Sequence, residues 1–74
     1  MSFLPRVSGR ELAKALRSFG YEIDHQTGSH MILRNARSPY RRLTVPDHRE
    51  LSTGTLRAII RQAGLSVEQI KEAL

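Results

Sequence analysis

The stretch Tyr21-Glu22-Ile23-Asp24-His25-Gln26-Thr27-Gly28-Ser29-His30-Met31-Ile32-Leu33-Arg34 decides the fold. Residues 21–26 alternate apolar and polar side chains and residues 30–34 form an apolar run, so the pattern predicts a β-hairpin. Gly28 can adopt a positive φ, and Gly28 with Ser29 leaves room for a backbone or a phosphate to come close. The hairpin therefore presents a histidine, His30, at the first position after its tip.

Two registers are compatible with this hairpin. A loop of two residues pairs Asp24 with Leu33, which puts a carboxylate among apolar side chains. A loop of three residues, Thr27-Gly28-Ser29, pairs Ile23 with Leu33 instead. We predict the second register, because a slip of one residue moves every side chain to the other face. The apolar face would then hold Tyr21, Ile23, His25, Met31 and Leu33, and the polar face Glu22, Asp24, Gln26, His30, Ile32 and Arg34.

A capping box and an apolar repeat predict a helix before the hairpin. Ser8 can serve as the N-cap, and Glu11 follows it three residues later. The helix is expected over residues 9–19 and ends before Gly20, which suits a left-handed C′ position. Its basic residues are expected to face solvent: Arg10, Lys14 and Arg17.

The second half of the chain predicts a third strand and two helices. Residues 41–45 alternate, and Pro46 ends the strand because it has no N–H for a ladder. Thr53 is the expected N-cap of the next helix, and Ser66 with Gln69 forms the capping box of a short last helix. The apolar stripe of the longer helix consists of Leu56, Ile59, Ile60 and Ala63.

These elements predict one domain over residues 1–74, of the α+β class. The order α-β-β-β-α, followed by a short extra helix, gives a three-stranded antiparallel sheet with helices on one face. The core is expected to include Leu16, Ile23, Leu33 and Ile60. The other face of the sheet is left to solvent, and it would carry His30, Arg34, Arg42 and Thr44.

Composition favours a polyanionic partner. The chain has 74 residues, a formal net charge of +5 and no cysteine, and its pI is about 10.8. In so small a domain this charge points to nucleic acid more than to an anionic membrane surface, since no long helix is strongly basic on one face. No signal peptide or membrane span is visible, so a cytoplasmic protein is expected. A disulfide or cysteine zinc site is excluded.

His30 is the main candidate for chemistry. Imidazole titrates near neutrality and can take or give a proton, and Arg34 and Arg42 on the same predicted face could hold a phosphate. RNA supplies its own nucleophile, the 2′-hydroxyl, so such a site needs neither a covalent residue nor a metal. The alternative is that His30 only pairs across the strand with Gln26 or Asp24.

The other histidines give weaker signals. His48, in a loop after the third strand, could transfer a proton, contact a phosphate or cap the loop, and the structural roles are favoured. The three histidines have no matched spacing, whereas zinc ligands usually come in close pairs, so no metal or other cofactor is predicted. The Ser-Thr-Gly-Thr run at residues 52–55 is expected to cap a helix and not to bind phosphate.

Several segments match a known family: Gly9 to Leu16, Phe19-Gly20-Tyr21, Gly28-Ser29-His30, Val45-Pro46-Asp47-His48, Gly54-Thr55-Leu56-Arg57 and Gln62-Ala63-Gly64-Leu65. In these segments the chain resembles the HicA family of small toxins, which pair with HicB antitoxins. The resemblance implies a fold like the double-stranded-RNA-binding domain, ribonuclease action on mRNA and inhibition by the antitoxin. The family's catalytic histidine corresponds to His30. The chain departs from the family at Thr27, where members often carry a basic residue.

The sequence therefore predicts an RNA endonuclease of the toxin type, with His30 as general base or general acid. Gly28, Ser29, Arg34, Arg42 and His48 are the expected RNA contacts, and a HicB-like protein is the expected inhibitor. Two other interpretations stay open, a non-catalytic RNA-binding module and a HicA-like protein without activity. The sequence also leaves open whether the chain forms a homo-oligomer.

Overall fold

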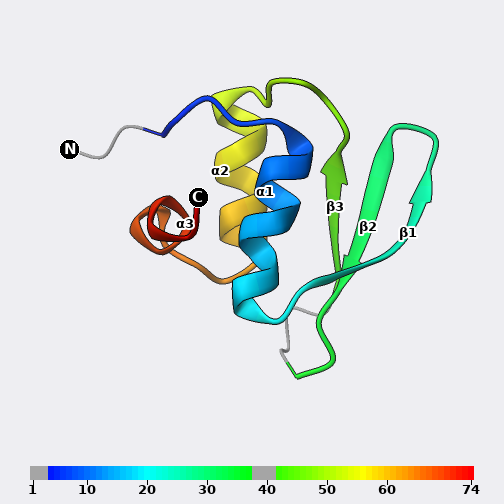
Figure 1. Cartoon of the computed structure of the whole chain (residues 1–74). Coiled ribbons are helices and arrows are strands. Elements are labelled where there is room, and N and C mark those ends of the chain that lie inside the picture. The colour runs from blue at the N-terminus through cyan, green and yellow to red at the C-terminus, as the bar shows by residue number, and fades with distance from the viewer. Residues whose placement is uncertain (1–3, 38–41) are drawn as a thin grey trace.

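The computed structural model describes residues 4–37 and 42–74. The helices and strands follow in the predicted order (Figure 1). Their bounds are α1 (Gly9–Leu16), η1 (Arg17–Phe19), β1 (Glu22–Thr27), β2 (His30–Arg34), β3 (Arg42–Pro46), α2 (Thr53–Gln62) and α3 (Val67–Ala73). Arg41, the predicted first residue of the third strand, lies outside the described residues.

The three strands form an antiparallel sheet in the order β1-β2-β3. α1 and α2 lie against one face of this sheet, and α3 packs on these two helices on the side away from the sheet (Figure 1). This arrangement is the small α+β sandwich that the sequence predicts. One face of the sheet is therefore free of helices, and it carries the candidate residues.

The capping boxes begin two of the helices as predicted. At α1 the Ser8 side chain accepts the Glu11 amide at 3.0 Å, and the Glu11 carboxylate accepts the Ser8 amide at 2.8 Å. Ser66 and Gln69 make the same pair of bonds at α3. Because such caps satisfy amides that have no partner within the helix, they define where each helix begins.

The N-cap of α2 is one residue earlier than predicted. Ser52 is extended and its side chain accepts the Thr55 amide at 3.2 Å, whereas Thr53 is already the first helical residue. A cap needs non-helical backbone angles and a reachable amide three residues on, and Ser52 meets both requirements. The run at residues 52–55 thus caps the helix, as the sequence indicates.

The predicted register of the hairpin is right at its open end and wrong at its tip. Ile23 pairs with Leu33 as predicted, but Thr27 pairs with His30, so the loop has two residues instead of three. A β-bulge at Asp24 absorbs the difference of one residue. The bulge lets a tight glycine turn and the apolar pairing exist in the same hairpin, which neither uniform register allows.

The bulge also moves two side chains to faces opposite to those predicted. His25 pairs with Ile32, so it lies on the open face of the sheet and not on the apolar face. Gln26 pairs with Met31, which is buried under the helices, so Gln26 lies on the helix-covered face. Directly opposed residues of an antiparallel pair share a face, which settles both positions.

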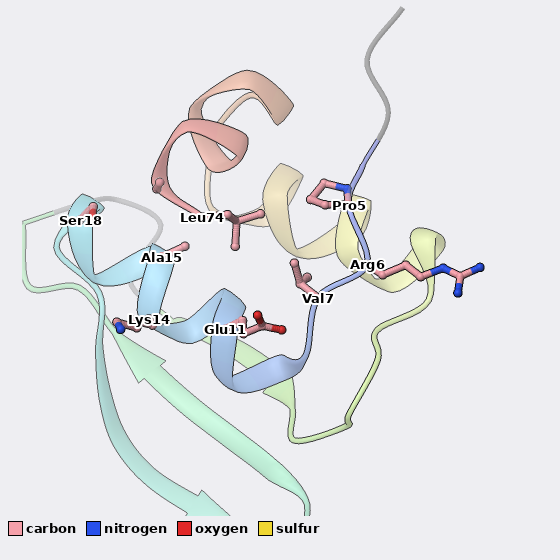
Figure 2. Close-up of a pocket in the computed structure, with 9 residues that line it drawn as sticks. Pro5, Arg6, Val7, Glu11, Lys14, Ala15, Ser18 and Leu74 are labelled. Carbon is pink, nitrogen blue, oxygen red and sulfur yellow. The ribbon is translucent and has the colours of Figure 1, made fainter.

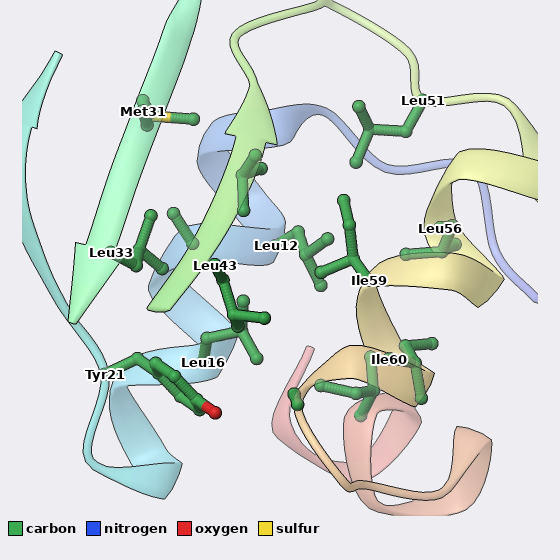
Figure 3. Close-up of a cluster of buried hydrophobic side chains, with 14 of the residues drawn as sticks. Leu12, Leu16, Tyr21, Met31, Leu33, Leu43, Leu51, Leu56, Ile59 and Ile60 are labelled. Carbon is green, nitrogen blue, oxygen red and sulfur yellow. The ribbon is translucent and has the colours of Figure 1, made fainter. Parts of the chain in front are cut away.

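The core lies between the helical layer and the sheet (Figure 3). Leu16, Leu33 and Ile60 are buried in it as predicted. Ile23 is 52% exposed, so its assignment to the core is wrong. The reason is its position on β1, an edge strand that is exposed along its whole length. Other large buried side chains of the core are Leu12, Tyr21, Met31, Leu43 and Leu56.

Candidate functional site

The helix-free side of the sheet, here called the open face, collects most of the polar and basic candidates. Along β2 and β3 the buried residues alternate with exposed ones, so His30, Arg34 and Arg42 all point to this side as predicted. Cross-strand pairing places Thr27 beside His30 and Arg34 beside Arg42. The open face consists of Glu22, Asp24, His25, Thr27, His30, Ile32, Arg34, Arg42 and Thr44.

The hairpin tip is held by hydrogen bonds that its carbonyl groups accept. Gly28 has φ +57°, which a tight two-residue turn requires at its first central position. Its carbonyl oxygen accepts a bond from the Gln26 side chain at 3.2 Å, and the Ser29 carbonyl accepts the Asp47 amide at 2.6 Å. A Cβ added at Gly28 would meet no atom within 4 Å, so the outer side of the turn is open. The carbonyl groups of the turn are therefore held by Gln26 and Asp47, and the outer side of Gly28 stays accessible to a ligand.

Asp47 connects three segments around this tip. Arg10 of α1 donates to both of its carboxylate oxygens at 3.1 Å, and Gln26 of β1 donates to Oδ2 at 3.1 Å. These bonds lower the pKa of Asp47, with the Arg10 bond the largest cause, and the same contact raises the pKa of Arg10. The sequence analysis missed this pair, because 37 residues separate its members and no local pattern joins them.

The loop that carries His48 is held at the same end of the sheet. The His48 carbonyl accepts the Gly9 amide at 2.9 Å. A Cβ on Gly9 would overlap the Pro46 carbonyl oxygen, so only glycine permits this approach of α1 to the end of β3. The His48 side chain is exposed. Because His30 pairs with Pro46, the structure brings His48 to the end of the sheet where His30 lies.

His30 is exposed at the start of β2. Over residues 4–37 and 42–74, its imidazole has no hydrogen bond or ion pair. The two partners considered for a purely structural role bond elsewhere, Gln26 to Asp47 and Asp24 to His25. The imidazole is therefore available to a ligand.

The two arginines lie on the same face but further along it. Arg34 is four positions after His30 on β2, which corresponds to a Cα distance of about 13 Å in an extended strand. The Arg34 guanidinium is held 3.4 Å from the Asp24 carboxylate, and Arg42 is directly opposite Arg34. Their charges, after the bond from His25, help to lower the pKa of Asp24.

Hollows of the described surface also lie away from the open face, and two of them adjoin α1. One, of about 590 Å³, is on the side of α1 that faces the chain termini, and none of the candidate residues lines it (Figure 2). The other, of about 240 Å³, is a groove between α1 and β1, bordered by Ile23 and by three cations of α1 and η1 that the sequence predicts to face solvent. The cations are Arg10, Lys14 and Arg17.

No group of three or more His, Cys, Asp or Glu side chains within residues 4–37 and 42–74 is arranged to hold a metal ion. In the same residues, no helix is long and apolar enough to cross a membrane.

Comparison with known families gives a match over most of the chain. Residues 9–65 match the family model of the HicA toxin of bacterial toxin-antitoxin systems. The match spans α1, the whole sheet and α2. The chain belongs to the HicA toxin family.

HicA toxins are generally mRNA interferases, and membership implies HicB antitoxins and RNA as the general partners. No individually curated protein matches this HicA chain. Helix α3 lies outside the matched part of this HicA protein.

Proposed function

We propose that this HicA protein is a metal-independent endoribonuclease that uses His30 for proton transfer and is neutralised by a HicB-like antitoxin. The observation that carries the proposal is the exposed His30 imidazole, which has no partner among the described residues and stands beside an open glycine turn on a face with two arginines. Family membership supports the choice of RNA as the substrate.

The reaction follows from the substrate's own chemistry. The 2′-oxygen attacks the adjacent phosphorus, the bond from phosphorus to the 5′-oxygen breaks, and the products end in a 2′,3′-cyclic phosphate and a 5′-hydroxyl. One proton leaves the 2′-hydroxyl and one must reach the 5′-oxygen, and His30 carries out one of these transfers. Arg34 and Arg42 hold neighbouring phosphates, while Gly28, Ser29 and His48 border the scissile one.

The test is cleavage of RNA by His30→Ala in a nuclease-free preparation. A positioned acid or base contributes about 10²–10⁴-fold, so we expect a loss of that size. Folding should be unchanged because the side chain is exposed, and RNA affinity should mostly survive because arginines carry it. Lys71→Ala, on α3, is the matched control and should cleave at the parent rate.

Three further measurements define the mechanism. Cleavage should persist in EDTA, and it should stop when hydrogen replaces the 2′-hydroxyl at the cut site. His48→Ala decides between a chemical and a structural role for that residue, since only a chemical role predicts a loss as large as that of His30→Ala. If His30→Ala cleaves at the parent rate, the catalytic assignment is wrong and RNA binding without catalysis replaces it.

The proposed partner is tested by co-expression. The reading frame beside this one is expected to encode a HicB-like protein. Its co-expression should restore the growth of cells that make the active toxin, and the purified pair should not cleave RNA.

A further inference from the structure

His25 and Asp24 form a carboxylate–imidazole pair on the open face. Asp24 Oδ2 lies 2.7 Å from His25 Nδ1, and the two side chains are 38% and 48% exposed. Successive side chains of a regular strand point to opposite faces and would not meet in this way. The β-bulge at Asp24 makes the contact possible, and it also turns His25 toward the open face.

The same bulge makes His25 a neighbour of His30. Ile32 lies directly opposite His25 and two residues from His30, so the two histidines are diagonal neighbours on adjacent strands. Diagonal positions on one face are about 7–8 Å apart. That spacing joins the Cα atoms, and imidazoles that extend outward from two such positions can each reach one phosphate group with a hydrogen bond of about 3 Å.

Asp24 determines which nitrogen of His25 is free. Hydrogen bonding to His25, followed by the nearby positive charge of Arg34, lowers the pKa of Asp24, so its carboxylate is ionised at neutral pH. An ionised carboxylate only accepts hydrogen bonds, so His25 Nδ1 must carry the hydrogen and Nε2 is left for another partner. A carboxylate in this position orients the imidazole.

We propose that His25, oriented by Asp24, is the general acid of the cleavage reaction, and that His30 is the general base. This inference rests on the proposed endoribonuclease function. His30 takes the proton of the 2′-hydroxyl as the 2′-oxygen bonds to phosphorus. His25, in its protonated form, gives the Nε2 proton to the 5′-oxygen as the bond from phosphorus to that oxygen breaks, and it keeps the hydrogen on Nδ1 that Asp24 accepts. The two histidines then hold the opposite protonation states, and exchange with water restores them.

The partners of the histidines support this division of roles. His25 has a carboxylate partner that accepts the hydrogen on Nδ1, so Nε2 is the nitrogen directed away from Asp24 and able to donate to a substrate. In the described part of the chain, the His30 imidazole has no carboxylate partner, so both of its ring nitrogens are open to the substrate. Asp24 also holds the Arg34 guanidinium at 3.4 Å, so it is a positioning residue for both side chains.

The test compares two RNA substrates that differ only in the leaving atom. In one substrate the bridging 5′-oxygen at the cut site is replaced by sulfur. A thiol ionises near pH 8.5, far below an alcohol, so the thiolate leaves without a general acid. On ordinary RNA we expect His25→Ala to lose about 10²–10⁴-fold in cleavage rate, and on the sulfur substrate the loss should nearly disappear.

Three variants serve as comparisons. His30→Ala should remain impaired on both substrates, because removal of the 2′ proton is needed in either case. Asp24→Asn should show a smaller loss than His25→Ala, and sulfur should reverse that loss too. Lys71→Ala should match the parent on both substrates. Circular dichroism and thermal melting confirm that each variant is folded.

The outcomes separate this inference from the function on which it rests. If His25→Ala cleaves ordinary RNA at the parent rate while His30→Ala is impaired, the role of His25 is wrong and the endoribonuclease stands. Equal losses of His25→Ala on the two substrates also refute the general acid. If His30→Ala cleaves the sulfur substrate at nearly the parent rate, His30 is the general acid, and our assignment of the two roles is wrong. If neither histidine matters, the proposed function fails as well.

Discussion

Replacing Gly9 with alanine should destabilise this protein, although helix propensity alone predicts the reverse. Gly9 is the first residue of α1, and alanine in a helix is favoured over glycine by up to about 1 kcal/mol. In the structure, however, a Cβ at Gly9 overlaps the Pro46 carbonyl oxygen, and it would lie 2.9 Å from the Pro46 carbonyl carbon and 3.3 Å from the Asp47 Cα. All three are backbone atoms, so no side-chain rotation can relieve the overlap.

The magnitude follows from two costs. Forcing a methyl group into a well-packed site costs about 1–3 kcal/mol. Moving α1 away from β3 also breaks the Gly9 amide bond to the His48 carbonyl, and such a bond contributes about 0.5–1.5 kcal/mol. After the gain in helix propensity, we expect a net loss of about 0.5–3.5 kcal/mol in the free energy of unfolding, with a fall of about 2–28 °C in Tm.

Gly54→Ala is the matched control, because Gly54 is also helical but a Cβ there meets no atom within 4 Å. Urea unfolding followed by circular dichroism should show Gly9→Ala destabilised and Gly54→Ala unchanged or slightly more stable. If Gly9→Ala is as stable as the parent, α1 does not approach β3 in the way described here. That result would also remove the restraint that we assign to the His48 loop.

Three further predictions concern the core, the pH dependence and the RNA contacts. Leu33→Ala should lower the free energy of unfolding by about 2–5 kcal/mol, because Leu33 is completely buried. A chain of 74 residues has only about 4–11 kcal/mol of stability in total, so urea unfolding should show a large loss. The pKa of Asp47 is lowered by folding, so its contribution to stability is present above the ordinary value of about 3.9 and is lost as pH falls through the lower folded value. Unfolding measured from pH 7 to pH 3 should therefore decline less steeply in acid for Asp47→Asn than for the parent, and identical slopes would contradict the ion pair. Arg34→Ala and Arg42→Ala should each make the log–log salt slope of single-stranded RNA affinity less negative by about 0.7, and unchanged slopes would show that neither residue contacts a phosphate.

The sequence predicts well those features that depend on neighbours along the chain. The capping boxes at Ser8 and Ser66 bond residues three apart, so their geometry is local and was correctly predicted. The faces of β2 and β3 also follow from simple alternation, which correctly put His30 and Arg34 on the open face. The N-cap of α2 shows the limit of such reasoning, because Ser52 and Thr53 are both good caps and only the backbone angles choose between them.

The sequence by itself determined the order of the elements, the apolar faces of the inner strands, the family and the candidate His30, because each depends on local pattern or motif. The tertiary structure alone decided the bulge at Asp24, the pair of Arg10 with Asp47 and the approach of Gly9 to β3. The physical reason is that a pattern assumes one register along a strand, whereas the tight turn and the apolar pairing here require two. The bulge that reconciles them is set by contacts across the sheet, and it puts His25 on the open face at a position diagonal to His30.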